Sequence, residues 1–343
     1  MIKNIKLNDF RLFSDYNISF KEGLNILVGE NGVGKTSIIE AVYLASTTKS
    51  FRTSYFNSLV KNDENKMNVT IETTEKMYYL YFDGGKKLFK INNTPYKRLK
   101  DYVGDFKTVV FSSYDLNLID GTKSDRRHFL DIEISMLNKN YLSSISKYKK
   151  LIDEKNEVLK SAKIDEIYMK LLNENLANLI KVIYEERISF LELLNNELKD
   201  ITKKINFNSV KLEYQKTYDA LDIYKSLYDK LESDIKTKSS QIGTHRDDFV
   251  IKIAGYDAKE YASLGQKRLI VVLIKVALKK IIEEKEEVVL LLDDVFAALD
   301  KNRIKDIVNY IKDSKQVLIT TTSVDEIPKE LLLDSNIIEI GEK

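Results

Sequence analysis

The sequence of 343 residues contains no cysteine, two histidines and two prolines. Without cysteine the chain has no disulfide framework, no cysteine nucleophile, no zinc–thiolate site and no thiolate-bound iron–sulfur cluster. Two histidines also argue against a histidine-rich metal enzyme. The longest apolar run, from Leu269 to Ile274, is far too short to span a membrane. The first residues lack the apolar segment of a secretory signal. We therefore expect a soluble, cytoplasmic protein without a membrane partner.

Charge is nearly balanced, because 55 Lys and Arg residues oppose 53 Asp and Glu residues and the formal net charge is +2. This balance excludes a uniformly basic nucleic-acid-binding surface, although it permits a local basic face. Hydrophobic residues make up 43% of the chain, which is enough for a folded core. At about 150 residues per domain, the length suggests roughly two domains.

Strand-like segments fill the first and last thirds of the chain. They are expected at residues 2–7, 16–20, 24–28, 67–73, 77–82, 87–91, 106–111, 249–253, 288–292, 316–320 and 336–340, with a buried helix at 262–282. Residues 124–238 contain neither proline nor glycine, and leucine and isoleucine recur there at helical spacing. The sequence thus predicts an α/β domain built from both chain ends, with a helical insertion between them.

Residues 29–36 read G-x-x-x-x-G-K-T, directly after an apolar strand and before a helical run. In this context the motif binds nucleotide phosphates through backbone N–H groups at a helix N-terminus. Lys35 would place a positive charge on the β- and γ-phosphates, and Thr36 would offer a hydroxyl to Mg²⁺. The alternative is a glycine-rich turn without a ligand, and the strand–helix context argues against it. The predicted ATP contacts are Gly29, Asn31, Gly32, Gly34, Lys35, Thr36 and Ser37.

A fully apolar strand ends in Asp293 and Asp294. In a parallel sheet both carboxylates lie at the carboxyl edge, where ligands bind. Asp293 would hold Mg²⁺, and Asp294 would orient and deprotonate the attacking water. The alternative is a buried strand followed by a polar helix cap.

The segment Ala262-Ser263-Leu264-Gly265-Gln266 resembles the L-S-G-G-Q signature of ABC-type ATPases. Ser263 and Gln266 also fit an ordinary capping box, and the residues alone leave both interpretations open. In ABC-type heads this helix N-terminus contacts the γ-phosphate held by a second molecule. The resemblance therefore implies that Ser263, Gly265 and Gln266 contact ATP across a homodimer, with a D-loop at residues 297–300.

Basic residues outnumber acidic ones in the first helix of the insertion, where Tyr141 and Tyr148 lie between them. The basic residues are Lys139, Lys147, Lys149, Lys150, Lys155 and Lys160. Such a helix releases counterions from a DNA backbone, but a solvated helix face has the same composition. No base-reading motif is recognisable, so we expect any DNA binding to be independent of sequence.

Taken together, these segments resemble the RecF family, bacterial recombination-repair ATPases of the SMC-like ABC group. The matching segments lie at residues 10–11, 29–41, 49–53, 111–116, 125–131, 243–248 and 293–294. The resemblance implies an ABC-type P-loop ATPase head with an inserted helical arm, divided as 1–115 (head), 116–240 (arm) and 241–343 (head). It also implies that Arg11 contacts the nucleotide.

The resemblance further implies an ATP-dependent clamp in DNA replication, repair and recombination. ATP would close a homodimer on duplex DNA near single-strand gaps, and slow, Mg²⁺-dependent hydrolysis would reopen it. The implied partners are RecR and RecO, which help to load RecA on gapped DNA. An SMC- or OLD-like ABC ATPase with another DNA or protein client is the alternative.

Several positions depart from the family pattern. Thr244 replaces a proline, Ala297-Ala298 replaces Ser-Glu, and neither a Q-loop glutamine nor a switch histidine is identifiable. A transporter ATPase usually has both of the latter, and an OLD-type effector has an appended nuclease domain, so we expect neither class. The roles of Arg52, Arg126, Arg127 and the His245-Arg246 pair remain open at this point.

Overall fold

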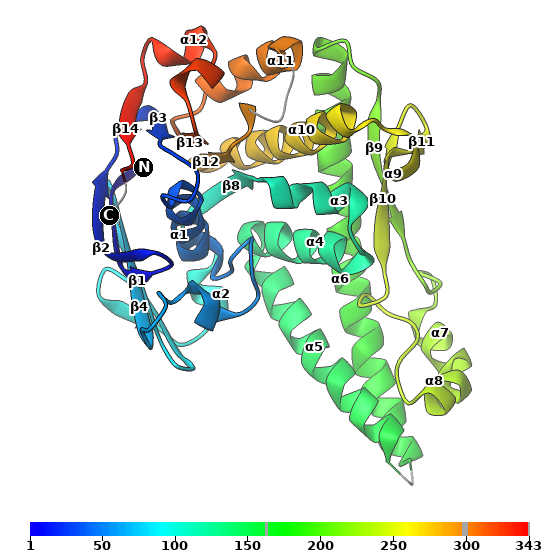
Figure 1. The fold of residues 1–343 in the computed structure, drawn as a ribbon. Helices are drawn as coiled ribbons and strands as arrows, with labels where there is room; N and C mark the ends of the chain where they lie inside the picture. The colour runs from blue at the N-terminus through cyan, green and yellow to red at the C-terminus, as the bar shows by residue number, and fades with distance from the viewer. Residues whose placement is uncertain (162–163, 297–300, 342–343) are drawn as a thin grey trace. The chain divides into compact units, whose positions relative to one another are not determined.

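The computed structural model describes residues 1–161, 164–296 and 301–341, and the chain divides into two compact units. The first unit consists of Met1–Leu116, Lys204–Phe207 and Ala262–Lys343, and the second of Asn117–Lys203 and Asn208–Tyr261. Both ends of the chain therefore build the first unit, and the middle of the chain builds the second (Figure 1).

The first unit begins with an antiparallel sheet of six strands in the order β2-β1-β4-β5-β6-β7. Its strands are β1 (Ile2–Phe10), β2 (Phe13–Ser19), β4 (Lys66–Thr73), β5 (Met77–Asp83), β6 (Lys86–Ile91) and β7 (Thr94–Tyr96). Alternate side chains of β4, at Met67, Val69 and Ile71, are buried, so one face of the sheet packs on the core. The strands predicted from residue 2 to residue 91 are confirmed.

A five-stranded sheet forms the centre of the first unit in the order β14-β3-β13-β12-β8, and its neighbouring strands are parallel. The strands are β3 (Gly23–Val28), β8 (Lys107–Phe111), β12 (Val288–Asp293), β13 (Gln316–Thr321) and β14 (Asn336–Glu339). Every residue of β12 is buried, as its continuous apolar sequence predicts for a covered parallel strand.

Helix α1 lies between the two sheets of the first unit, because it packs against β4 and β5 of one and β8, β12 and β13 of the other. The helices and 3₁₀ turns of this unit are α1 (Lys35–Thr47), α2 (Leu99–Tyr102), α10 (Leu264–Glu283), α11 (Lys301–Lys312), α12 (Lys329–Leu332), η1 (Phe56–Leu59), η2 (Ser113–Leu116) and η4 (Val324–Glu326). The loop from β3 to α1 thus lies at the carboxyl edge of the parallel sheet, where β12 also ends.

The second unit is mainly helical. Its elements are α3 (Asn117–Asp120), α4 (Lys123–Leu137), α5 (Lys139–Lys160), α6 (Glu166–Lys204), β9 (Val210–Gln215), α7 (Ile223–Asp229), α8 (Leu231–Thr237), β10 (Asp248–Ile253), β11 (Tyr256–Asp257) and α9 (Ala258–Tyr261). A reciprocal capping box between Thr122 and Asp125 starts α4, and the Asn138 side chain caps α5. Helix α6 buries one stripe that includes Leu176, Ile180 and Ile183.

The helical prediction for residues 124–238 is wrong at β9. This six-residue strand pairs antiparallel with β10 along its whole length. The same pairing draws β10, β11 and α9 into the second unit, whereas the sequence analysis assigned everything after residue 240 to the head. A short strand whose partner lies over thirty residues away leaves no helical or local turn signal in the sequence.

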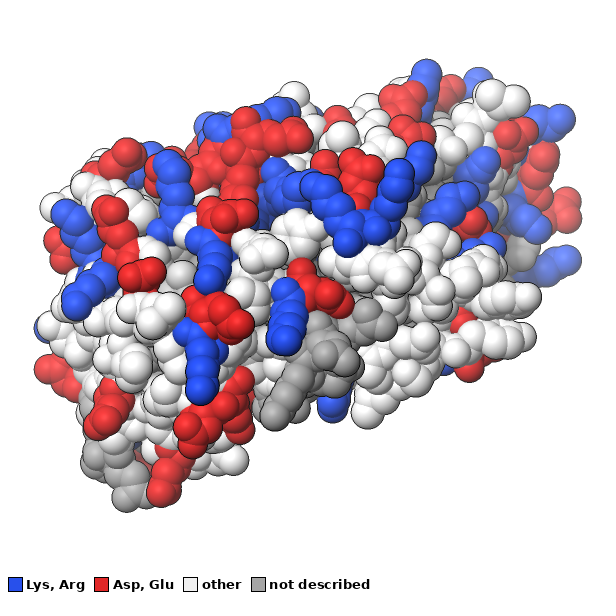
Figure 2. Space-filling view, turned by 90° about the horizontal axis from the view of Figure 1, so that it is seen from above, with Lys and Arg blue, Asp and Glu red and all other residues white. Residues whose placement is uncertain are grey.

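In the described part of the chain, no helix is long and apolar enough to cross a membrane. On the face drawn in Figure 2, Lys and Arg side chains are interspersed with Asp and Glu side chains. This face is therefore of mixed charge, in keeping with the net charge of +2.

Candidate nucleotide-binding site

The loop between β3 and α1 has the geometry of a phosphate-binding turn. Gly34 precedes α1 with a φ of 105°, in the left-handed region that favours glycine. A Cβ atom at Gly34 would lie 2.5 Å from the Phe13 ring, and one at Gly29 would lie 2.4 Å from the carbonyl oxygen of Ile340. No side chain caps the first turn of α1, so its N–H groups are available to an anion. The loop therefore fits the phosphates of a nucleotide.

Lys35 points back over this loop. Its side chain is buried, and its Nζ donates to the carbonyl oxygens of Gly29 and Glu30 at 2.7 and 2.8 Å. These two bonds hold the cation at the mouth of the turn that the backbone N–H groups surround. A charge fixed there favours the anionic phosphates that the sequence analysis assigned to it.

Thr36 and Asp293 meet although 257 residues separate them in the sequence. Thr36 Oγ1 donates to Asp293 Oδ1 at 2.8 Å. Both are oxygen donors, which is the chemistry that Mg²⁺ prefers. The two predicted metal ligands therefore fit the ion, and β3 and β12 bring them together at the carboxyl edge of the sheet.

The two carboxylates of β12 have different surroundings. Asp293 is 7% exposed, whereas Asp294 is exposed and has a left-handed backbone with a φ of 51°. Burial raises the pKa of Asp293, although hydrogen bonds from Thr320 and Thr36 oppose the rise. Burial also raises the pKa of Asp294, while Lys35 lowers it. The pair thus combines a buried carboxylate on the Thr36 hydroxyl with a more accessible carboxylate near Lys35.

Arg11 and Arg52 are held by Glu40 of α1, a residue to which the sequence analysis gave no role. Arg11 forms a two-pronged ion pair with Glu40 at 2.6 and 2.8 Å, and Arg52 lies 3.3 Å from the same carboxylate. Ser50 also donates to Glu40, whose side chain is fully buried. The Arg52 charge lowers the pKa of Asp293, so this network reaches the metal site. In the sequence, the sign of this network was an acidic residue, Glu40, in the helix that follows the phosphate-binding loop.

The signature segment starts α10 with a complete capping box. Ser263 Oγ accepts from the backbone N–H of Gln266, and Gln266 Oε1 accepts from the backbone N–H of Ser263 at 2.8 Å. Ser263, Leu264 and Gly265 are exposed. The cap is therefore real, and contact with a second molecule's ATP stays a prediction. The predicted D-loop at 297–300 lies outside the described residues.

Comparison with known proteins identifies the family. The family model RecF/RecN/SMC N terminal domain matches residues 1–331. The DNA replication and repair protein RecF of Acholeplasma laidlawii is 35% identical over 325 residues, which cover 94% of this chain and 93% of the relative. RecF of Clostridium acetobutylicum is 34% identical over 354 residues, which cover 99% of this chain and 97% of the relative. The chain belongs to the RecF family.

Solved structures agree with this assignment. The structure described as the recombination mediator protein RecF-ATP in the RecFOR pathway is 32% identical, has a TM-score of 0.89, and covers 95% of this chain and 93% of its own. An SmcHead bound to the C-winged helix domain of ScpA is 18% identical with a TM-score of 0.55, covers 98% of this chain and 93% of its own, and so shares the fold alone. The predicted ABC-type ATPase head with an inserted helical arm is confirmed.

In this RecF-family chain, Thr320 contacts both residues of the Asp293-Asp294 pair. The sequence had indicated no role for Thr320, only that a switch histidine is not identifiable. β12 and β13 pair in parallel with Asp293 opposite Thr320. Thr320 Oγ1 donates to Asp293 Oδ1 at 2.8 Å and accepts from the backbone N–H of Asp294 at 3.0 Å. One hydroxyl therefore contacts the Asp293 carboxylate and the Asp294 backbone. In the sequence, the sign of this polar contact was the run of threonines at 320–322, at the end of a predicted strand.

The basic helix predicted to contact DNA presents fewer groups than its composition indicated. Tyr141 and Tyr148 are buried, and Lys155 is completely buried in an ion pair with Asp234 at 2.9 Å. Those three residues are therefore corrected to structural roles. Lys139, Lys147 and Lys150 are exposed on the same helix. The exposed basic face is therefore narrower than the composition indicated, because the side of α5 that carries Tyr141, Tyr148 and Lys155 is buried.

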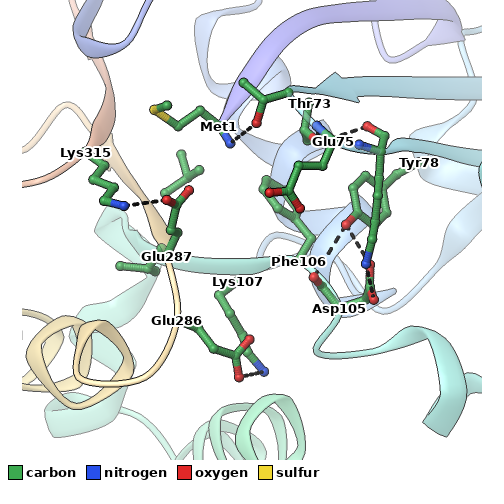
Figure 3. Close-up of a pocket in the computed structure, with 14 residues that line it drawn as sticks. Met1, Thr73, Glu75, Tyr78, Asp105, Phe106, Lys107, Glu286, Glu287 and Lys315 are labelled. Carbon is green, nitrogen blue, oxygen red and sulfur yellow. Dashed lines mark hydrogen bonds and ion pairs between the residues drawn. The ribbon is translucent and has the colours of Figure 1, made fainter.

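The first unit also has a pocket away from the nucleotide site. It lies where the parallel strands begin, and its volume is about 260 Å³ (Figure 3). Lys315 pairs there with Glu287, and Lys107 lies 3.4 Å from Glu286. Asp105 accepts a hydrogen bond from Tyr78 at 2.7 Å. These charges are paired with one another, and ligands of α/β folds bind at the opposite edge of such a sheet. The nucleotide site is therefore the carboxyl edge.

Proposed function

We propose that this RecF-family protein is an ATPase of recombinational DNA repair that closes as a homodimer on duplex DNA near single-strand gaps. Slow, DNA-stimulated hydrolysis reopens the dimer. The observation that carries the proposal is the junction of Thr36, Asp293 and Thr320 beside the phosphate-binding turn. Membership of the RecF family supports the role in DNA repair. The RecFOR pathway named for a solved relative supports RecO and RecR as partners.

The residues divide the chemistry among them. The loop N–H groups and Lys35 bind the phosphates of ATP, and Thr36 with Asp293 would hold Mg²⁺. When bound, the ion supplies positive charge that offsets charge developing on the transferred phosphoryl group. Asp294 orients the attacking water and accepts its proton. Thr320 keeps the Asp294 backbone in place, since it accepts a hydrogen bond from that N–H.

The dimer interface is proposed at the start of α10. Ser263, Gly265 and Gln266 would contact the γ-phosphate bound by the other copy, which makes ATP part of the interface. Exposure of Ser263 and Gly265 at a helix N-terminus supports this contact. Hydrolysis removes the shared γ-phosphate, so the two copies separate. DNA contact through exposed lysines of α5 is independent of base sequence.

The deciding experiment measures binding to a gapped duplex at fixed moderate salt, with and without Mg-ATP. Asp294→Asn is used because it binds ATP without turnover, and Lys35→Ala is the matched variant that lacks nucleotide binding. We expect Asp294→Asn to bind the gapped duplex as an ATP-dependent dimer, and Lys35→Ala to remain monomeric. Binding that ignores ATP, or a monomer in saturating Mg-ATP, contradicts the clamp and directs attention to another client.

A further inference from the structure

Two family-like segments take no part in the ATP site. They are residues 125–131 and 243–248, which lie more than a hundred residues apart in the sequence. The structure gives two of their arginines structural roles. Arg126 forms a two-pronged ion pair with Asp248 at 2.7 and 3.0 Å, and Arg246 donates to the carbonyl oxygen of Ser240. Arg127 and His245 also form hydrogen bonds within the second unit, but both of them border a pocket.

These two residues line the same pocket of the second unit, which has a volume of about 200 Å³. The pocket lies between α4, α5, α6 and the loop that precedes β10. The lining residues that bear on its chemistry are Arg127, Asp131, Lys149, Arg187, Thr244 and His245. The fold therefore brings both segments to one concave site.

The lining carries three cations, Arg127, Lys149 and Arg187, against one carboxylate, Asp131. That carboxylate already has three donors. It accepts from Tyr141 at 2.8 Å, from Arg187 at 2.9 Å and from Lys149 at 3.0 Å. Burial alone would raise the pKa of Asp131, but Arg187 and Lys149 lower it, so the group is an anion. The lining therefore has more cations than anions, although Arg187 also lies 4.0 Å from the Asp247 carboxylate outside the lining.

Arg127 is the cation with the least compensation. Its Nη1 donates to the carbonyl oxygen of Asp247 at 2.9 Å, and within the described ranges no carboxylate lies in ion-pair contact with it. Burial lowers the pKa of Arg127 and the neighbouring Arg187 charge lowers it further, although the nearby Asp248, Asp131 and Asp247 charges oppose this shift. A half-buried guanidinium in this position is stabilised by an anion that enters from the pocket.

The remaining polar wall includes His128 and His245. Burial lowers the pKa of His245 to about 4, so its imidazole is neutral near pH 7. Its Nε2 lies 3.1 Å from the Ser240 carbonyl oxygen and must donate, so Nδ1 accepts from the Tyr148 hydroxyl. Thr244 Oγ1 is buried beside the Tyr148 hydroxyl, and its hydrogen bond to that hydroxyl opposes the rise in the pKa of Tyr148 that burial causes.

We propose that this pocket binds a phosphate monoester, with Arg127 as its principal ligand and Lys149 as a further donor. Arg127 lies on α4 and Lys149 on α5, so the two cations reach the site from different helices. A tetrahedral dianion accepts bonds from several directions, whereas a carboxylate is planar and carries one charge. A terminal phosphate protrudes into a hollow, while the phosphodiesters of a continuous duplex lie flat along a surface.

The bound phosphate group has two possible sources: the phosphorylated end of a DNA strand, or a small free phosphate such as a nucleotide or inorganic phosphate. The inference goes beyond the ATP-driven clamp because it uses none of the P-loop residues. It is tested in full-length protein that carries Lys35→Ala, which removes the phosphate affinity of the P-loop. No ATP is added, so failure of the clamp proposal does not affect the outcome.

Three probes are titrated into this protein: inorganic phosphate, deoxyadenosine 5′-monophosphate, and a duplex whose ends are either 5′-phosphorylated or 5′-hydroxyl. Calorimetry serves the small probes and fluorescence anisotropy the duplexes. We expect at least one monoester probe to bind, and Arg127→Gln to weaken that binding about tenfold or more, as loss of a charge-assisted contact requires. Tighter binding of the 5′-phosphorylated duplex than of the 5′-hydroxyl duplex identifies strand ends as the source. Equally tight binding of inorganic phosphate and deoxyadenosine 5′-monophosphate identifies free phosphate as the source.

Two further variants keep the result interpretable. Arg98→Gln makes the same charge change at a side chain that is 70% exposed in the first unit, and it should leave probe binding unchanged. Lys149→Gln, at a 62% exposed side chain, should weaken binding severalfold without affecting the fold, in case Arg127→Gln unfolds the unit. If neither Arg127→Gln nor Lys149→Gln changes binding of any probe, or if only an acidic peptide such as hexaglutamate binds, the proposal is wrong.

Discussion

The carboxyl edge of the parallel sheet and the polar centre of the second unit both bury charged groups, but they satisfy them differently. Asp293 accepts hydrogen bonds from two hydroxyls, and no cation of the described residues forms an ion pair with it. Arg187, in the second unit, is 1% exposed and donates to Asp131, Tyr141, Tyr214 and the Thr244 carbonyl oxygen. The charge of Asp293 is left for a ligand to complete, whereas the charge of Arg187 is completed within the protein.

This difference indicates which region stabilises the fold and which region reacts. A buried charge with a full set of partners is strongly destabilising to remove, because its partners become unpaired. A buried charge without a counter-ion costs free energy in the folded state and persists where a ligand supplies the missing partner. We therefore expect loss of Arg187 to reduce stability, and mutations at the sheet edge to reduce activity.

The largest expected effect is on stability, in the variant Arg187→Met. It leaves Asp131 buried without its guanidinium partner, so the second unit should lose about 3–5 kcal/mol. Urea unfolding followed by circular dichroism measures the loss. Arg98→Met, at an exposed side chain, is the control and should stay within about 0.5 kcal/mol of the wild type. A loss below about 1 kcal/mol in Arg187→Met would remove the contrast between the two regions.

Sequence alone was sufficient to predict the residues at the carboxyl edge of the parallel sheet. It was insufficient to predict the polar centre of the second unit. The P-loop and the Asp293-Asp294 pair are local patterns, and parallel strand ends meet at one edge, so their contact could be predicted. The Arg187 centre joins α4, α5, α6 and β9 through side chains that no short motif contains. In the sequence Tyr141 lies among the basic residues of its helix, and spacing on one helix does not tell which face another helix covers.

The polar centre should also make stability depend on pH through His245. The folded-state pKa of about 4 lies below the ordinary value of 6.5, because the ring is buried. The unfolded chain therefore binds the extra proton first as the pH falls. The stabilising effect of the neutral ring is complete above pH 6.5 and is lost as the pH falls toward 4. The full loss is up to about 3 kcal/mol.

Urea unfolding at several pH values between 4 and 7 checks this expectation. His245→Gln has no titrating group, and its amide retains a donor and an acceptor for Ser240 and Tyr148. The difference in stability between wild type and His245→Gln should shrink with acidification. A difference that is independent of pH across this range would show that His245 is not buried as a neutral ring.

At the sheet edge we expect a large loss of activity and little or no loss of stability. Asp293→Asn keeps an oxygen that accepts from Thr36 and Thr320 but removes the charge whose burial raises the pKa of Asp293. ATP hydrolysis should fall about 100-fold or more. The free energy of unfolding should stay the same or rise by about 1 kcal/mol, since the uncompensated charge is gone. Steady-state phosphate release and urea unfolding measure the two quantities; a destabilisation like that of Arg187→Met would refute the distinction.

The smallest effect concerns Ser263, where the cap and the proposed contact with a second molecule share one side chain. Ser263→Ala removes the hydroxyl that accepts from the Gln266 N–H, which should cost about 1 kcal/mol of stability. Ser263→Asp restores the cap but places a negative charge where the other copy's γ-phosphate would lie. If the segment is only a cap, Ser263→Asp dimerises with Mg-ATP in the Asp294→Asn background. If the segment completes the second ATP site, Ser263→Asp is as stable as the wild type and remains monomeric. Sedimentation velocity separates these results, because stability and assembly then respond in opposite ways to one residue.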